Sequence, residues 1–365
     1  MIELEFLRYC MGVSDTVPFI KEKEWDGVFS FCLRQSITGI GFSGIEKMPP
    51  EQKCPKELLL KWFALTEQIK RRNQLLNQRC VELVEELQQD GFQCCILKGQ
   101  GNAIYYGSGL KEKGRSLAQL RTPGDIDVWV RTKDDGRCKK GVVIEYAKKQ
   151  NPKAEVRYYH VEYEWKGVPV ELHFTPGIMN NPWYNRRLQK WFKAHGTCVM
   201  VDLPDGVGAI HVPSKDFNII FQMVHMMNHF FDEGIGLRQM IDYYYLLQSA
   251  KDKLIMDNGQ LNITLKYLGL EKFARAVMYI MKEILGLEDK CLIAPVDEKR
   301  GKTLLGEIMK GGNFGHYSDL AQNNAFKKYI QKTWRNMHFV RAYPAEALCE
   351  PFFRTWHFLW RLKYN

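Results

Sequence analysis

The chain lacks several common sequence features, and each absence narrows its class. Among its 365 residues there is no apolar run of about eighteen residues, which excludes an ordinary membrane-spanning helix. The first residues include Glu3 and Glu5 and lack the basic and then apolar pattern of a secretory signal. We therefore expect a cytoplasmic protein with no membrane partner.

The ten cysteines form no Cys-x-x-Cys pair, which argues against a structural zinc site. The adjacent pair Cys94 and Cys95 falls in a predicted strand, where neighbouring side chains point to opposite faces. In a reducing compartment, the cysteines are therefore expected to act as small buried apolar residues, without disulfide partners.

Motifs of two large enzyme classes are also missing. No Gly-Lys-Ser/Thr ending follows a glycine-rich turn, so the chain has no Walker loop. His225 and His229 stand four residues apart on a predicted helix, but no Glu follows His225 as a His-Glu-x-x-His motif requires. They are either a two-histidine metal pair or histidines hydrogen-bonded within a helix interface, and the second interpretation is favoured.

The chain is basic and rich in apolar residues. Lys and Arg number 52 against 42 Asp and Glu, giving a net charge of +10, and 45% of the residues are hydrophobic. The charge favours an anionic partner such as a nucleotide or RNA. The length exceeds that of one ordinary core, and composition shifts predict an N-terminal helical region at 1–90, a core at 91–205 and a C-terminal helical domain at 206–365.

Helical patterns dominate both ends of the chain. Residues 1 to about 55 are expected to be helical and irregular, with a loop at Gly39–Gly44. Apolar residues at helical spacing predict one long helix over about 55–89, ended by Gly91. Ser214 is a predicted N-cap for a helix that runs to Phe231. The Trp- and Phe-rich C-terminal end is expected to cap the helical domain.

Strand patterns are confined to the middle of the chain. The expected order is a strand at 92–97, a glycine turn, a helix at 103–106, a loop at 107–121, a strand from 126, a helix at 141–149, and a hairpin of strands 156–165 and 168–174. This order predicts a small mixed sheet with its polar groups at one edge. In the last strand, Glu171 and His173 share one face.

Asp125 and Asp127 lie at the start of the strand that follows Pro123-Gly124, on the same face of that strand. Two such charges about 5 Å apart repel by roughly 3 kcal/mol at an effective dielectric constant near 20. A lone Asp-x-Asp is ordinarily an exposed turn with two solvated carboxylates. The glycine turn upstream and Glu171 downstream instead favour a divalent cation with oxygen ligands.

The order of these elements resembles the nucleotidyltransferase superfamily with a polymerase-β-type core, and more narrowly a poorly characterised bacterial nucleotidyltransferase group. The motifs that carry the resemblance span about residues 92 to 247 and are Leu97-Lys98-Gly99, Arg121, Asp125-Ile126-Asp127, Glu171-Leu172-His173 and Leu237-Arg238 with Asp242. The resemblance implies an α+β fold, in which a polymerase-β-like core with a small mixed sheet is flanked by N- and C-terminal helical regions.

The resemblance also implies Mg²⁺-dependent transfer of an NMP from an NTP to an acceptor hydroxyl. Asp125, Asp127 and Glu171 would hold two Mg²⁺ ions, and Glu171 would be the third ligand or a general base. His173 would tune the site from beside Glu171, or would be a structural histidine.

The glycine turn is the implied nucleotide-binding element. Backbone N–H groups of Gly99, Gln100 and Gly101 would bind the phosphates, and Lys98 or Arg121 would add positive charge. The acceptor is left open between a small molecule, a protein and RNA.

Two other functional interpretations remain beside the enzyme. One is a degenerate member that binds a nucleotide or a protein without catalysis, because Gln100 replaces a small residue and the connection from Gly99 to Asp125 is long. The other is an RNA-directed enzyme, such as a toxin acting on tRNA ends, which only the net charge suggests. Three clustered carboxylates would be costly to retain without a cation, which favours the enzyme.

Overall fold

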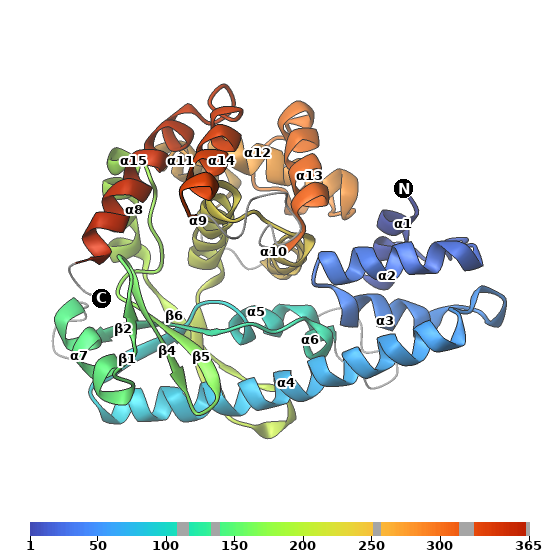
Figure 1. Cartoon of the computed structure of the whole chain (residues 1–365), viewed down its shortest axis with the longest axis horizontal. Coiled ribbons are helices and arrows are strands. Elements are labelled where there is room, and N and C mark those ends of the chain that lie inside the picture. The colour runs from blue at the N-terminus through green and yellow to red at the C-terminus, as the bar shows by residue number, and fades with distance from the viewer. Residues whose placement is uncertain (108–116, 133–138, 251–256, 314–324, 363–365) are drawn as a thin grey trace.

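A five-stranded mixed sheet lies within the computed structural model, which describes residues 1–107, 117–132, 139–250, 257–313 and 325–362. In sheet order, its strands are β1 Phe92–Ile96, β2 Ile126–Thr132, β5 Val168–His173, β4 His160–Trp165 and β3 Glu155–Val156. Strands β2 and β5 run parallel, and the other neighbouring pairs run antiparallel. The predicted α+β class, with a small mixed sheet flanked by helices, is confirmed (Figure 1).

The two faces of this sheet differ in polarity because side chains alternate along each strand. On one face the apolar residues of β2, such as Val128, pack in a core with the long helix α4 Lys56–Gln89 and with α7 Lys140–Gln150. The opposite face carries Asp127, Glu171 and His160 on β2, β5 and β4. The polar groups therefore cross a face of the sheet, and the prediction that they lie at one edge was wrong.

Helix α4 forms as its apolar spacing predicts and runs along the sheet (Figure 1). Gly91 follows it with a φ of 87°, a left-handed conformation that glycine adopts without steric cost. The predicted helices at 141–149 and 214–231 also form, as α7 and as α9 Lys215–Asp232. Ser214 is the N-cap residue of α9, but its backbone carbonyl rather than its side chain accepts the bond from Asn218.

The glycine-rich segment expected to be a loop is helical, so that prediction was wrong. Residues Thr38–Lys47 form α3, whose glycines lie against neighbouring elements. A Cβ at Gly39 would lie 2.3 Å from the carbonyl oxygen of Leu120, and one at Gly44 would lie 2.2 Å from the Cys10 sulfur. Glycine is needed here for close packing, which outweighs its low helix propensity.

Several short elements differ from their predicted bounds. The glycine turn leads directly into α5 Gln100–Ala103 and the 3₁₀ helix Ile104–Gly107, and α6 Leu117–Leu120 ends the segment predicted as a loop. Residues 108–116 of that loop lie outside the described residues. The strand predicted at 156–165 is interrupted, because the backbone N–H of Arg157 bonds back to the carbonyl of His160 in a tight turn between β3 and β4.

Residues 175–213 carry elements that the sequence did not predict. These are α8 Pro182–His195 and an antiparallel hairpin of β6 Cys198–Asp202 and β7 Ala209–Pro213. The remaining α-helices of the described chain are α1 Ile2–Cys10, α2 Trp25–Arg34, α10 Leu237–Ala250, α11 Asn258–Tyr267, α12 Glu271–Tyr279, α13 Glu298–Gly311, α14 Ala325–Met337 and α15 Pro344–Arg361.

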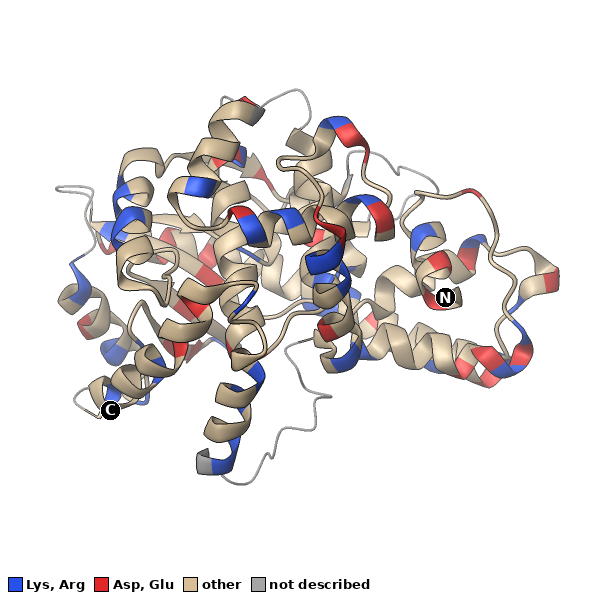
Figure 2. Cartoon of the chain, turned by 90° about the horizontal axis from the view of Figure 1, so that it is seen from above, with Lys and Arg blue, Asp and Glu red and all other residues tan. Residues whose placement is uncertain are grey.

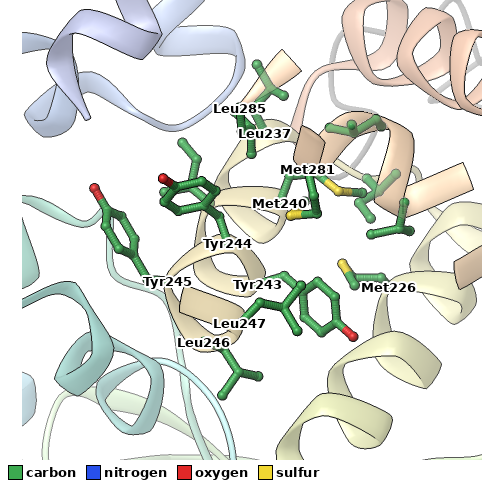
Figure 3. Close-up of a cluster of buried hydrophobic side chains, with 14 of the residues drawn as sticks. Met226, Leu237, Met240, Tyr243, Tyr244, Tyr245, Leu246, Leu247, Met281 and Leu285 are labelled. Atoms are coloured by element: carbon green, nitrogen blue, oxygen red, sulfur yellow. The ribbon is translucent and has the colours of Figure 1, made fainter. Parts of the chain in front are cut away.

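The N-terminal and C-terminal helices share one apolar core. It extends from Phe6 and Trp25 to Phe339, and it includes most of α9 and α10. Helix α10 is buried along most of its length, and apolar side chains of neighbouring elements, such as Met226 and Met281, pack beside its own Met240 (Figure 3). The predicted division at about residues 90 and 205 stays a prediction.

The aromatic C-terminal helix contacts more than the helical domain. Helix α15 packs on α9 and α14, and in its second half Phe353, Trp356 and Trp360 make edge-to-face contacts with Tyr158 beside the sheet. Helix α15 therefore contacts the region that carries the sheet as well as the helical domain that it was expected to cap. No helix among the described residues has the length and apolar character needed to cross a membrane.

Substitution of Gly39 tests the packing account of α3. We expect Gly39→Ala to lower the free energy of unfolding by about 1–3 kcal/mol, because its Cβ meets a backbone carbonyl that cannot rotate away. Gly27→Ala in α2 is the matched control, since no atom lies within 4 Å of its Cβ, and it should stabilise by about 0.5 kcal/mol. Urea unfolding measures both, and equal effects would contradict the packing account.

Glu346 on α15 makes stability depend on pH. Burial raises the pKa of this carboxyl from 4.5 to about 7, although backbone N–H groups of Asn180 and Asn181 bond to it. The folded state therefore favours the protonated carboxyl. The stabilisation that this carboxyl contributes to the fold is present in full below pH 4.5 and is lost as the pH rises through about 7.

We expect Glu346→Gln to remove this loss, which amounts to at most about 3 kcal/mol. Urea unfolding at about pH 5 and about pH 8 measures it. The exposed control Glu57→Gln should keep the wild-type difference between the two pH values. An unchanged pH difference in Glu346→Gln would contradict the assignment.

Candidate functional site

Three carboxylates meet at the start of β2. Asp125 directly precedes the strand, Asp127 lies within it, and Glu171 is the register partner of Asp127 on the parallel strand β5. One carboxylate oxygen from each lies within 4.8 Å of the other two, and the Asp127 side chain is 1% exposed. The structure thus brings together the three acids that the sequence singled out, in an arrangement that could hold a metal ion.

Lys98 supplies positive charge to this cluster. It follows β1, and its Nζ lies 2.7 Å from Oδ1 of Asp127. Burial acts to lower the pKa of Lys98, but the charges of Asp127, Asp125 and Glu171 outweigh burial and raise the pKa well above its ordinary value. A charged ammonium group therefore lies among the carboxylates, as expected where like charges are held together.

His173 lies between two of the acids. Its Nε2 is 3.0 Å from Oδ1 of Asp127 and 3.1 Å from Oε2 of Glu171. Burial opposes protonation, but these hydrogen bonds raise the pKa of His173 to about 9. For Glu171, burial acts in the raising direction, and the charge of His160, the bond to His173 and the charge of Lys98 together lower its pKa to about 2.

The polar row continues beyond the predicted residues. His160 on β4 is the register partner of His173, and its Nε2 lies 2.7 Å from Glu162 and 3.8 Å from Glu171. Arg157 donates from Nε to Glu162 at 3.0 Å. Sequence reasoning missed His160 because it lay at the fifth position of a strand expected to start at Val156. In the structure it begins β4 itself, directly after the turn.

The glycine turn lies beside the acids. Gly99 has a φ of 59°, which favours glycine, and a Cβ there would make a tight contact of 3.3 Å with the carbonyl oxygen of Asp125. The N–H of Gly101 donates to the carbonyl of Lys98. The Gln100 side chain is buried and donates to Asn77 on α4, so it is directed away from the acids.

The Arg121 side chain is bound within the protein and is not available to a ligand. It is 4% exposed, and its Nε and Nη2 each donate to Asp242 of α10 at 2.7 Å. The hydroxyl of Tyr106 also donates to Asp242, at 2.5 Å. This bidentate pair joins the segment before β2 to the helical region.

A second arginine, Arg238 of α10, lies beside the segment that leads to Asp125. Arg238 donates from Nη1 to the carbonyl of Thr122, and a Cβ on Gly124 would lie 3.9 Å from this nitrogen. Burial and the charge of Arg121 lower the pKa of Arg238, while Asp242 and Asp125 oppose them. The sequence named Arg238 only as part of a motif and gave it no role in the site.

The two histidines of α9 bond to each other, as the favoured interpretation expected. Their Nε2 atoms lie 3.1 Å apart, and the rings meet edge to face. Burial and then the charge of Lys98 lower the pKa of His225, and the charges of His229 and His173 act in the same direction. Trp129 of β2, on the same face as Asp127, stacks on Phe217 of α9, so this helix lies against the polar face of the sheet.

The basic residues are not confined to one helix. Figure 2 shows Lys and Arg distributed over most of the helices and interleaved with Asp and Glu. The excess of ten positive charges therefore does not single out one element as a binding surface.

Comparisons with known proteins identify the family of the chain. A family model described as "uncharacterised nucleotidyltransferase" matches residues 21–286. A solved structure of an antigenic nucleotidyltransferase-like protein from Paracoccidioides brasiliensis aligns over 64% of this chain and 95% of its own, with 11% identity and a TM-score of 0.35. That structural likeness is too weak to support an argument. No curated protein matches the chain.

Removing one partner of the buried pair between Arg121 and Asp242 is expected to destabilise the fold. Arg121→Met should lower the free energy of unfolding by about 3–5 kcal/mol, because it leaves a carboxylate buried without its partner. Lys302→Met is the control, since the ion pair of Lys302 with Glu298 is exposed, and it should leave unfolding unchanged. Urea unfolding monitored by tryptophan fluorescence measures both. An Arg121→Met variant as stable as the control would contradict this account.

Proposed function

Since this chain belongs to the family of uncharacterised nucleotidyltransferases, we propose that it transfers an NMP from an NTP to an acceptor hydroxyl in a reaction that requires Mg²⁺. The observation that carries the proposal is the convergence of Asp125, Asp127 and Glu171 within 4.8 Å. Carboxylate oxygens are the ligands that Mg²⁺ prefers. The Lys98 ammonium group lies 2.7 Å from Asp127, which fits a site that binds positive charge.

Two Mg²⁺ ions, when bound, would activate the acceptor hydroxyl and stabilise the leaving pyrophosphate. Asp125, Asp127 and Glu171 would be their ligands. His173 would hold the Asp127 and Glu171 carboxylates in position through its two hydrogen bonds.

Positive side chains near the turn would bind the triphosphate. Lys98, which contacts Asp127 here, would transfer its contact to a phosphate oxygen once cations balance the carboxylates. Backbone N–H groups of Gly99 and Gln100 would donate to the phosphates, because the turn places them beside Asp125. Arg121 would act through its pair with Asp242, which fixes the segment leading to Asp125.

The position of Gln100 favours the catalytic interpretation over a degenerate one. A large side chain at this position would favour the non-catalytic alternative if it covered the glycine turn. Here the side chain is buried against Asn73 and Asn77 of α4, so the turn itself is not covered by it. The proposal that the chain is an active enzyme therefore needs no change at Gln100.

Mg²⁺-dependent nucleotide binding tests this function directly. A panel of NTPs is titrated with and without Mg²⁺ against wild type, Asp125→Ala and Asp127→Ala. We expect the Mg²⁺-dependent part of the affinity to fall by about 100-fold or more in both variants, since loss of even an outer partner of a metal site costs 10–100-fold.

The exposed β4 residue Glu164 offers a matched control, because Glu164→Gln removes a carboxylate from the same sheet but outside the cluster. This control should bind as wild type does. Transfer of label from an α-³²P-NTP to a cellular fraction, lost in the same two variants, would add direct support for catalysis. Identical Mg²⁺-dependent binding in wild type and both Asp variants would contradict the proposal.

A further inference from the structure

Two buried histidines face each other across neighbouring strands beside the carboxylate cluster. His160 on β4 and His173 on β5 are register partners, 4% and 2% exposed, with ring centroids 5.0 Å apart. Glu171 lies against both, with Oε2 3.1 Å from Nε2 of His173 and Oε1 3.8 Å from Nε2 of His160. One donor atom from each of these three residues lies within 4.8 Å of the other two.

A second observation concerns the other nitrogen of each ring. Nδ1 of His160 and Nδ1 of His173 are buried and have no hydrogen-bond partner within the described part of the chain. Buried polar atoms are almost always satisfied, so an orphaned one indicates a water molecule that belongs there. Such a water would accept the Nδ1 hydrogen of each ring, as the outer partner of a metal-binding histidine does, and would leave Nε2 as the ligand atom.

We propose that His160, Glu171 and His173 form a second divalent-cation site, which prefers a nitrogen-binding cation such as Zn²⁺ over Mg²⁺. Two imidazoles and a carboxylate are a common donor set for Zn²⁺, whereas Mg²⁺ prefers oxygen ligands. Donor atoms bound to one such cation lie about 3–4 Å apart. The Glu171 distances to both histidines fall in this range.

The surrounding groups fit this assignment. Glu162 lies 2.7 Å from Nε2 of His160, and Asp127 lies 3.0 Å from Nε2 of His173, so each ring has an acidic neighbour that stabilises a positive charge beside it. The Nε2 hydrogens that point to these carboxylates leave to solvent when the cation takes their place. Each ring then keeps its hydrogen on Nδ1.

Glu171 belongs both to this site and to the carboxylate cluster. A cation held by the histidines would engage one oxygen of Glu171 and leave the other toward Asp127. The proposal concerns ion binding alone and does not require catalysis or nucleotide. It is therefore tested independently of the proposed nucleotidyl transfer.

The experiment uses the full chain with two probes, Mn²⁺ and Zn²⁺. Pulsed electron paramagnetic resonance detects ¹⁴N nuclei bound to Mn²⁺, and calorimetry measures Zn²⁺ affinity. The variants are His160→Gln, His173→Gln and the double variant, with circular dichroism to confirm folding. Exposed His338→Gln is the matched histidine control, His225→Gln tests the α9 pair, and Asp125→Asn alters only the carboxylate cluster.

We expect a ¹⁴N signal in wild type, His338→Gln, His225→Gln and Asp125→Asn, and none in the double variant. Zn²⁺ affinity should fall by about tenfold or more in each single variant. Absence of a ¹⁴N signal in wild type, its persistence in the double variant, or its loss in His225→Gln would overturn the proposal. Should His173→Gln fail to fold, His160→Gln alone decides, since an unchanged Zn²⁺ affinity there would contradict the site.

Discussion

The mutual repulsion of three carboxylates is the constraint on which the rest of this structure depends. Asp125, Asp127 and Glu171 are held together because β2 and β5 are parallel neighbours in register. Such a group is stable only where positive charge lies among its members. Here Lys98 and His173 supply that charge, and each is kept protonated by the acids that it contacts.

The rest of the fold holds this cluster in place from two sides. The apolar face of the sheet packs on α4 and α7, which fixes the strands and therefore the spacing of the acids. From the other side, Asp242 of α10 binds Arg121, four residues before Asp125. Because α10 is buried in the core shared by the N- and C-terminal helices, this pair connects the cluster to the bulk of the helical region.

The sequence predicted those features that depend on local periodicity. The long helix α4, the strand after Asp125 and the shared face of Glu171 and His173 follow from spacing alone, and the structure has each of them. Alternation along strands was also enough to expect Asp127 and Glu171 on polar faces. Only the family resemblance implied that these acids meet around a common point, because they come from separate segments of the chain.

Features set by packing between distant segments were not predictable in this way. The glycines of α3 indicated a loop, and only the approach of Leu120 and Cys10 shows why a helix needs them. Arg121 was expected to meet phosphate, yet its partner Asp242 lies 121 residues away in the sequence. His160 was hidden within an apparent strand, and its pairing with His173 depends on the turn that precedes β4.

The most direct test of this account is a crystal structure of the protein with Mn²⁺ and a non-hydrolysable NTP. The account predicts anomalous density bonded to Asp125, Asp127 and Glu171, with the α-phosphate facing the metal and Lys98 moved from Asp127 to a phosphate oxygen. Density that lies elsewhere, with the Lys98 ammonium still bound between the carboxylates, would contradict it.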